Sequence, residues 1–565
     1  MITNNSNLEA QVLDKTRLDK AELEANSFDI SQNQLLDTGI LEAMANSYFP
    51  EFNLQGEDCI AKKALQTAWQ SAEQISLNSS APGYSPKAYQ NAGSLSESDY
   101  INAISEVLNF EENERLADIS GTDKAAGIAE SFANEIKIDN WSNDYRNLSF
   151  SPIVLPKGIS SSSYFDVNAV RRDFPILSEK VDGKDLIWFD NAATTQKPNS
   201  VIDRVSYFYQ HENSNVHRGA HTLAARTTDA YEGARCKIKS FLNASSSEEI
   251  VFVRGTTEAI NLIAQTYGKA NIREGDEIVI SCLEHHANIV PWQMLCVETG
   301  AKLRVIPVDE NGQVILSEYE KLLGPKTKIV SFTHVSNALG TITPVPEMVS
   351  IAHRYGAKVL VDGAQAVSHL RVDVQAWDCD FYVFSGHKVF GPTGIGVVYG
   401  KSEILKNMPP YQGGGNMIAD VTFEKTVYQD PPHRFEAGTG NIADAIGLGA
   451  AIDYVSNLGL ENIYKYEHYL LEYGMEALQR IPGLKLIGTA KDKTSVLSFV
   501  IKGFSNDEIG KALSHEGIAV RTGHHCAQPI LRRFALESTV RPSLALYNTT
   551  SEIDELVAVL NKLRR

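Results

Sequence analysis

A lysine that directly follows an apolar segment is the first residue of this sequence to indicate covalent chemistry. Lys388 lies in FYVFSGHKVFGPTGIG, between a predicted buried strand and a glycine-rich turn. An amine at the end of a strand can form a Schiff base with an aldehyde, which is the central reaction of pyridoxal 5'-phosphate (PLP). Most lysines are exposed surface charges, so Lys388 alone does not establish a cofactor site.

Further residues around this lysine fit the same cofactor. Asp362 ends the predicted strand of KVLVDGAQAV, where a carboxylate can keep a pyridinium nitrogen protonated, although a simple turn cap also explains it. Thr256 and Thr257 begin a predicted helix after VFVRG, and a helix N-terminus binds anions such as a 5'-phosphate. N-capping explains the two threonines equally well. Ser385 and His387 flank the lysine and are predicted to donate further bonds to the phosphate.

Cys526 is the candidate nucleophile. It lies in RTGHHCAQP beside His524, His525 and Arg521, and such neighbours favour a thiolate over a thiol. An isolated cysteine is more often a small buried apolar residue. The paired histidines resemble metal ligands, but no second ligand cluster with zinc spacing accompanies them, so we predict no metal site.

The motifs EHHAN, VSNALG, DGAQ, SGHKxxGPTGIG and RTGHHCAQP together resemble those of the type II (SufS-like) cysteine desulfurases, which have the class V aminotransferase fold. The likeness extends from about residue 166 to the C-terminus. It implies that Lys388 binds PLP and that L-cysteine is the substrate. It also implies that the sulfur is carried as a persulfide on Cys526, with L-alanine as the product.

The resemblance assigns roles to other pocket residues. His285 is expected to stack on the pyridine ring and to pass protons. Asn337 and Gln365 match the residues that bond the carboxylate side of the substrate and the 3'-oxygen of the cofactor. Thr439, in EAGTGN, matches a residue that reaches the phosphate of the neighbouring subunit, which implies an obligate homodimer.

The same resemblance places arginines at the substrate carboxylate. Arg541 matches the residue that binds this group, a task suited to a planar bidentate donor, and Arg521 and Arg218 match residues of the same pocket. The HHCA sequence resembles the short-loop type of cysteine desulfurase. Such enzymes pass the persulfide to a dedicated transfer protein of the SufE or SufU kind, which we therefore expect as a partner.

The elements that must position these residues begin near Phe165, where short apolar runs alternate with helical segments and glycine turns. The runs predict a buried parallel sheet with helices on both faces. They are DLIWFD, EIVFV, EIVIS, KLRVIPV, KIVSFTHV, KVLVDGA, FYVFS and GVVYG. From about Ile442, long helices with a few strands (KLIG, VLSFVI) predict a second, smaller α/β domain.

Pattern and resemblance together predict PLP-dependent fold type I, which is aspartate aminotransferase-like. The large PLP-binding domain is expected at 185–457. The small domain, which carries the cysteine loop, is expected to combine 166–184 with 458–565.

Residues 1–163 differ from the rest in charge, with 11 Lys and Arg against 24 Asp and Glu. We expect this extension to be mostly disordered, since it is acidic and rich in polar residues. Short segments at 40–52, 101–110 and 126–138 have helical apolar spacing, but each is too short to be a stable helix alone. They are either residual helix in a linker or docking motifs for a partner protein, with SSSSYFDV at the junction.

The extension resembles the cargo-loading region of cysteine desulfurases that are packaged in family 2 encapsulin shells. ILEAMANSYF resembles its docking element. Several weak sites on one tail would gain affinity for a shell by multivalency.

Composition excludes several other classes. A formal charge of -18 disfavours binding to nucleic acid, and six cysteines without a CxxC pair do not indicate a disulfide framework. Without a signal sequence or a long apolar run, we expect a cytoplasmic protein, free or inside an encapsulin shell.

Other functions on this fold stay open at this point. Selenocysteine lyases, aminotransferases and kynureninases share the fold, which by itself does not distinguish their reactions. A non-catalytic scaffold is a further alternative. The joint presence of Lys388, Asp362, His285 and Cys526 argues against it.

Overall fold

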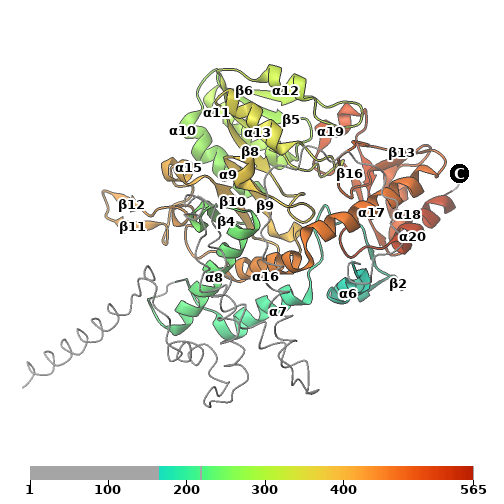
Figure 1. Cartoon of the computed structure of the whole chain (residues 1–565), viewed down its shortest axis with the longest axis horizontal. Helices are drawn as coiled ribbons and strands as arrows, with labels where there is room; N and C mark the ends of the chain where they lie inside the picture. The colour runs from blue at the N-terminus through green and yellow to red at the C-terminus, as the bar shows by residue number, and fades with distance from the viewer. Residues whose placement is uncertain (1–164, 217–218, 564–565) are drawn as a thin grey trace, which may run out of the picture. The chain divides into compact units, whose positions relative to one another are not determined.

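The computed structural model describes residues 165–216 and 219–563 (Figure 1). These residues belong to one compact unit, Pro156–Arg565. The three apolar segments of the N-terminal extension, at 40–52, 101–110 and 126–138, lie outside the described residues. Arg218 lies outside them as well.

A seven-stranded sheet forms the centre of the unit. Its order is β4 (Ile250–Val253), β10 (Gly396–Gly400), β9 (Phe381–Ser385), β8 (Lys358–Asp362), β7 (Thr327–Thr333), β5 (Glu277–Ser281), β6 (Lys302–Ile306). All neighbours are parallel except β10, which runs antiparallel to both β4 and β9. The sheet that the apolar runs predicted is therefore mixed, with one reversed strand.

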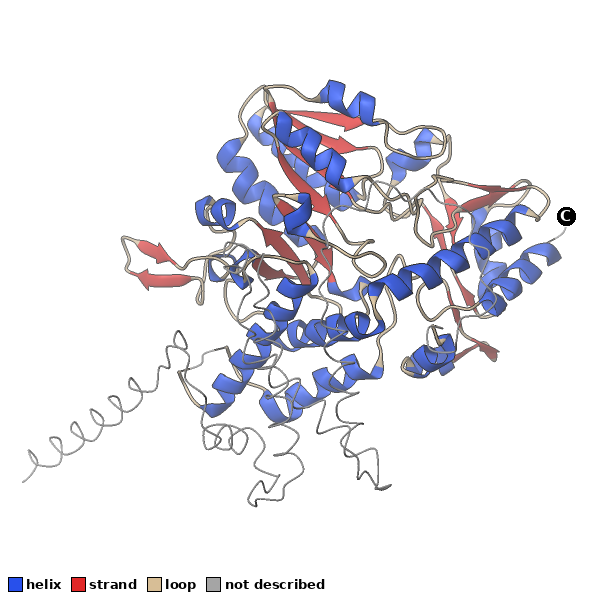
Figure 2. Cartoon of the chain, in the orientation of Figure 1, coloured by secondary structure: helices blue, strands red, loops and turns tan. Residues whose placement is uncertain are grey.

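Six of the seven strands are largely buried on both faces, which explains their apolar residues, whereas the edge strand β6 is mostly exposed and contains Lys302 and Arg304. Successive residues of a strand point to opposite faces. One face packs with α8, α13 and α16, and the other with α9 and α11 (Figure 2). The helices are α8 (Thr222–Phe241), α9 (Thr256–Ile263), α11 (Val290–Thr299), α13 (Val345–Arg354) and α16 (Ile442–Leu458).

A second layer of strands and helices is formed by the C-terminal segment. Its sheet has the order β13 (Leu484–Leu486), β14 (Phe499–Ile501), β17 (Thr539–Arg541), β16 (Arg521–Gly523). Helices α17 (Leu460–Gln479), α18 (Asn506–His515) and α20 (Thr550–Lys562) share a separate apolar core with it. This arrangement is the predicted smaller α/β part of the molecule.

The segment DLIWFD is placed differently from its prediction. It contains β3 (Ile187–Trp188), which pairs in parallel with β15 (Ile518–Ala519) and not with the central sheet. Phe189 accordingly belongs to the apolar core of the C-terminal part. A short apolar run does not specify its partner strand, so the sequence could not show whether this run joins the central sheet or pairs with β15. The domain boundaries at 185, 457 and 458 stay a prediction.

The remaining elements are short or lie at the periphery. A hairpin of β11 and β12 extends from the body at the left of Figure 1, with Phe423 exposed near its tip. Among the helices of the described residues, none has both the length and the apolar content that a membrane span requires. The elements are α6 (Val167–Arg172), β1 (Lys180–Val181), β2 (Lys184–Asp185), α7 (Asn199–Tyr207), α10 (Lys269–Asn271), α12 (Leu316–Leu322), α14 (Val374–Trp377), α15 (Ser402–Asn407), β11 (Ile418–Val421), β12 (Thr426–Tyr428) and α19 (Gln528–Arg533).

Candidate active site

Polar residues at the carboxyl ends of the parallel strands meet in one cavity of about 220 Å³. Ligands bind at this edge in open α/β sheets, because loops and helix N-termini converge there. Of the residues predicted from sequence, twelve line the cavity. They are Thr256, Thr257, His285, Asn337, Asp362, Gln365, Ser385, His387, Lys388, Arg521, Cys526 and Arg541.

Lys388 enters the cavity from a short 3-10 turn (Gly386–Lys388) that directly follows β9. Burial lowers the pKa of its amine to about 8, and the nearby carboxylate of Asp362 opposes part of that shift. Lys197 contacts this turn, because its Nζ donates a hydrogen bond to the carbonyl oxygen of His387 at 3.3 Å. A lysine with a lowered pKa is partly neutral near pH 8 and can react as a nucleophile or a base.

Asp362 ends β8 and is buried at 4% exposure. Its Oδ1 accepts a hydrogen bond from the backbone N–H of Ala364 at 2.9 Å. Burial raises the pKa of this carboxyl, while the bond from Ala364 and the charge of Lys388 lower it. A buried carboxylate at this depth is suited to a cationic partner such as a protonated ring nitrogen.

An anion cradle forms where α9 begins. Gly255 is the N-cap residue with φ +158°, and the Oγ of Ser385 contacts both the backbone nitrogen and the Oγ1 of Thr256 at 2.9 Å. His387 lines the same cavity, and burial lowers its pKa to about 4, so its ring is neutral near pH 7. N–H and O–H donors at a helix N-terminus are suited to a phosphate group.

His285 is held in one tautomer by the backbone. Its Nδ1 accepts a hydrogen bond from the N–H of Ala287 at 3.0 Å, which leaves Nε2 to carry the proton of a neutral ring. Burial, followed by the charge of Lys388, lowers its pKa to about 3. A neutral, fixed imidazole can cover a flat aromatic ring.

The loop of Cys526 spans the four residues between β16 and α19. His525 and Cys526 both have positive φ angles, +51° and +53°, which is rare for residues other than glycine. Asn337 Nδ2 donates to the carbonyl oxygen of His525 at 2.6 Å, and the N–H of His286 donates to that of Cys526 at 2.8 Å. These bonds join the loop to the segments that carry His285 and Asn337.

Arg541 is almost fully buried at 1% exposure and lines the cavity. Its Nη1 donates to the carbonyl oxygen of Asn337 at 3.0 Å, and its Nη2 donates to Asp190 Oδ1 at 2.9 Å. Arg521 lies opposite Arg541 on the paired strand. Gln365 Nε2 donates to the carbonyl oxygen of Ala192 at 2.5 Å, which closes this side of the cavity.

Two predicted site residues are not part of this cavity. Thr439 lines a second cavity of about 410 Å³, together with Tyr209 and Ile442. Its predicted role concerns a neighbouring subunit, so its distance from Lys388 in one chain neither supports nor contradicts that role. Arg218 lies outside the described residues.

Sequence reasoning missed Asp190, Thr333 and Glu284, and it named His525 only as a neighbour of Cys526. Thr333 and His525 line the cavity, while Asp190 contacts its arginines. Glu284 is fully buried directly before His285 and accepts a hydrogen bond from the backbone N–H of Thr333 at 3.0 Å. The polar run DNAATT after an apolar strand was a signal that could have indicated Asp190.

The residues around the cavity fit PLP in type and position. An amine, a buried carboxylate, a neutral imidazole and an anion cradle are the groups that the aldehyde, ring nitrogen, ring face and phosphate of PLP require. In addition, Asn337 Oδ1 and Arg541 Nε are buried and have no hydrogen-bond partner among the described residues. Buried polar atoms normally have partners, so these two indicate a polar ligand in the cavity.

A family model described as "Aminotransferase class-V" matches residues 187–556. This chain belongs to the class-V aminotransferase family. Cysteine desulfurases of the family use PLP.

Relatives and solved structures show the same likeness. The chain is 70% identical over 400 residues to a protein of Synechococcus elongatus named cysteine desulfurase, and the match covers 71% of this chain and 64% of that protein. A cysteine desulfurase of Escherichia coli is 52% identical over 402 residues, which is 71% of this chain and 99% of the relative. About 400 residues of this chain are thus shared with proteins named cysteine desulfurase.

Solved structures support the fold. The cysteine desulfurase CsdA of Escherichia coli, in an S-sulfonic acid form, has a TM-score of 0.66 at 38% identity, covering 71% of this chain and 98% of its own. The apo cysteine desulfurase of Thermococcus onnurineus has a TM-score of 0.67 at 38% identity, covering 70% and 97%. The predicted PLP fold type I is confirmed.

Proposed function

We propose that this chain is a PLP-dependent cysteine desulfurase that removes sulfur from L-cysteine and keeps it as a persulfide on Cys526. The proposal depends on one observation above all: Lys388 and Cys526, from separate elements, line one cavity together with Arg541. An amine that activates Cα and a thiol that takes the sulfur must reach the same small substrate. Relatives named cysteine desulfurase, 52% and 70% identical, support the same reaction.

PLP bound in this cavity would supply an electron sink for the Cα of the amino acid. Lys388 is proposed to bind the cofactor and then to carry the Cα proton on Nζ, which its lowered pKa of about 8 favours. Asp362 is proposed to hold a proton on the ring nitrogen, and His285 to cover the ring face. Arg541 is proposed to orient the substrate through its carboxylate.

Cys526 Sγ is proposed to attack the sulfur atom of the substrate. An S–S bond forms while the Cβ–S bond breaks, and the electron pair of the broken bond takes up a proton at Cβ. L-cysteine and the Cys526 thiol thus give L-alanine and a Cys526 persulfide, so no external oxidant or reductant is required. The CsdA structure, with its S-sulfonic acid, shows that a relative carries an oxidisable sulfur.

The experiment that tests the proposal measures L-alanine and protein-bound persulfide after L-cysteine is added to the purified holoenzyme. Cys526→Ala is expected to keep the absorbance of bound PLP and to lose persulfide formation and sulfide release under reductant. Cys236→Ala, which changes an exposed cysteine, is the matched control and should behave like the unmodified protein. Undiminished sulfur release by Cys526→Ala would exclude the proposal.

The short loop supports the SufS-like type II subtype as part of the proposal. Four residues separate β16 from α19, and hydrogen bonds from Asn337 and His286 anchor the loop. A loop held in this way cannot extend far from the cavity. An acceptor of the SufE or SufU kind is therefore proposed to bring its own thiol to Cys526. Added acceptor should raise the rate of alanine formation when persulfide discharge limits turnover.

A homodimer is also part of the proposal. Thr439 lines a cavity away from Lys388, and exposed apolar residues occur near it and on the projecting hairpin, including Tyr209, Phe423 and Tyr428. Apolar side chains gathered on a surface are typical of an interface. Sedimentation or light scattering of the holoenzyme should report twice the mass of one chain.

Packaging in an encapsulin shell is proposed from the sequence of residues 1–163 alone. Their acidic composition and short apolar segments support it. The test is co-expression of the cognate shell protein with the full chain and with a truncated chain that begins at Ser160. Equal packaging of both chains would exclude a loading role for the extension.

A further inference from the structure

Two arginines at the cavity share one carboxylate. Asp190 Oδ1 accepts a hydrogen bond from Arg541 Nη2 at 2.9 Å, and Asp190 Oδ2 lies 3.8 Å from Arg521 Nη1. The Arg541 side chain is 2% exposed, that of Asp190 17% and that of Arg521 47%. Arg541, Asp190 and Arg521 therefore form a chain of charges that leads from the protein interior to the solvent-accessible side of the cavity.

Asp190 counteracts a repulsion that the sheet creates. Arg521 and Arg541 are direct cross-strand partners on β16 and β17. Like charges in directly opposite positions destabilise a pair of strands. One carboxylate between the two guanidinium groups removes most of this repulsion and leaves a net charge of one positive unit.

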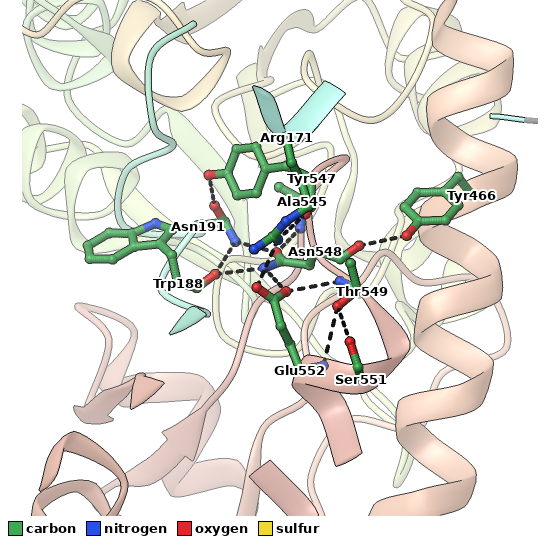
Figure 3. A network of polar contacts seen from close by, with 10 residues as sticks. All are labelled: Arg171, Trp188, Asn191, Tyr466, Ala545, Tyr547, Asn548, Thr549, Ser551 and Glu552. Atoms are coloured by element: carbon green, nitrogen blue, oxygen red, sulfur yellow. Dashed lines mark hydrogen bonds and ion pairs between the residues drawn. The ribbon is translucent and has the colours of Figure 1, made fainter. Parts of the chain in front are cut away.

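The position of Asp190 is fixed by the residue that follows it. Asn191 Nδ2 donates to the carbonyl oxygen of Ser543 at 2.7 Å and to Asn548 Oδ1 at 3.1 Å, and Tyr547 Oη donates to Asn191 Oδ1. Figure 3 shows Asn191 with two of these partners, Tyr547 and Asn548. Hydrogen bonds thus join the backbone next to the Asp190 carboxylate to the segment that follows Arg541, the last residue of β17.

Arg541 keeps several donors free, because a guanidinium carries five N–H groups. Its Nη1 is bonded to the carbonyl oxygen of Asn337 and its Nη2 to Asp190, whereas Nε has no partner among the described residues. Arg541 lines the cavity, so a ligand carboxylate there can accept from a remaining N–H of its guanidinium. Arg521 offers a second, more exposed guanidinium nearby, so without Asp190 the cavity would hold two unneutralised cations.

We infer that Asp190 is a specificity-determining residue, which matches the charge of the cavity to amino acids with one carboxylate and disfavours those with two. The inference rests on the proposed function, in which Arg541 binds the substrate carboxylate. L-cysteine and L-alanine carry one carboxylate, whereas L-aspartate has the same length with a second carboxylate in place of the thiol. Removal of the Asp190 charge gives that second carboxylate a cation to pair with.

The test is the binding of L-aspartate and of L-alanine to the holoenzyme, followed by the change in absorbance of bound PLP. In Asp190→Asn, the dissociation constant of L-aspartate relative to that of L-alanine should fall about tenfold or more, as expected for one uncompensated charge in a partly buried site. High salt should reduce the effect. An unchanged ratio would overturn the inference.

Two further variants separate charge from structure. Asp190→Asn combined with Arg521→Gln restores the net charge and should return the ratio toward that of the unmodified protein, whereas a merely structural role of Asp190 would not be rescued. Asp185→Asn, which changes an exposed carboxylate paired with Lys180, is the matched control. If Asp190→Asn does not fold, Asp190→Glu and Arg521→Gln provide the comparison. The dissociation constant of L-aspartate relative to that of L-alanine should be unchanged in Asp190→Glu and should rise in Arg521→Gln.

The outcome is distinguishable from failure of the proposed function. Absence of alanine formation from L-cysteine by the unmodified holoenzyme would refute the desulfurase proposal. An unchanged binding ratio in Asp190→Asn, with alanine formation intact, would refute only the role of Asp190.

Discussion

At the scale of single residues, burial changes the protonation of the groups that line the cavity. Lys388 has its pKa lowered to about 8, because a buried ammonium loses hydration. His285 and His387 have their pKa values lowered to about 3 and about 4 for the same reason. Near pH 7.5 the cavity therefore combines neutral imidazoles with an amine that is partly neutral.

The pKa of Lys388 predicts how cofactor uptake depends on pH. Only the neutral amine attacks an aldehyde, so the rate of PLP uptake by the apo protein should rise with pH and level off above about 8. Below pH 8 it should fall about tenfold per unit, since each unit removes nine tenths of the neutral amine. The measurement is the absorbance of bound PLP after stopped-flow mixing. A midpoint near 10.5, that of an ordinary lysine, would contradict the prediction.

Most residues of the candidate site could be found from sequence because they follow apolar strands. Lys388 and Asp362 come after β9 and at the end of β8, and the ends of parallel strands lie at one edge of a sheet. Asp190 also follows an apolar run, but that position does not predict its contact with Arg541. Its partner Arg541 is 351 residues away, and no local pattern encodes such a contact.

At the scale of elements, close approach of two glycines builds the anion cradle. A Cβ on Gly396 of β10 would lie 2.5 Å from the Cα of Gly255, which is the N-cap residue of α9. Strand β10 can thus pack directly against the turn at Gly255, which precedes Thr256. The sequence predicted both strands but not that β10 runs antiparallel, because an apolar run does not specify direction.

Gly396→Ala is expected to weaken PLP binding. The added methyl group must push the α9 turn away from β9 and so disrupt the contact between Thr256 and Ser385. Loss of two donors, each worth about 1 kcal/mol, corresponds to about a tenfold or greater increase in the dissociation constant. The measurement is equilibrium titration of the apo protein with PLP.

Gly324→Ala is the matched control for this change. A Cβ at Gly324 would meet nothing within 4 Å, and its backbone is not left-handed, so PLP affinity should stay at the value of the unmodified protein. Equal affinities of both variants would show that the cradle does not depend on the close packing of β10.

At the scale of the whole molecule, four buried or half-buried histidines make stability depend on pH. His285, His334, His387 and His525 have pKa values lowered to about 3, 3, 4 and 2, each chiefly by burial. In the unfolded chain these groups titrate near the ordinary value of 6.5. The unfolded state therefore binds more protons below pH 6.5, and folding stability must decrease as pH falls through that value.

His334 allows this linkage to be tested with a histidine that does not itself line the cavity. It is buried at 5% exposure, and its Nδ1 contacts Tyr382 Oη at 3.1 Å. Between pH 7 and pH 5 it should account for a loss of about 2 kcal/mol of unfolding free energy. His334→Gln removes the titrating group, so the difference in stability between variant and unmodified protein should shrink by about that amount over this range.

The measurement is the denaturation midpoint of both proteins at each pH with equal cofactor loading, so that effects of PLP release cancel in the difference. His515→Gln, at the exposed end of α18, is the control and should keep the unmodified pH dependence. Parallel curves for His334→Gln and the unmodified protein would mean that His334 takes up its proton at the same pH in the folded and unfolded states. Burial would then not be the dominant influence on this ring, and the same reasoning for His285 and His525 would fail with it.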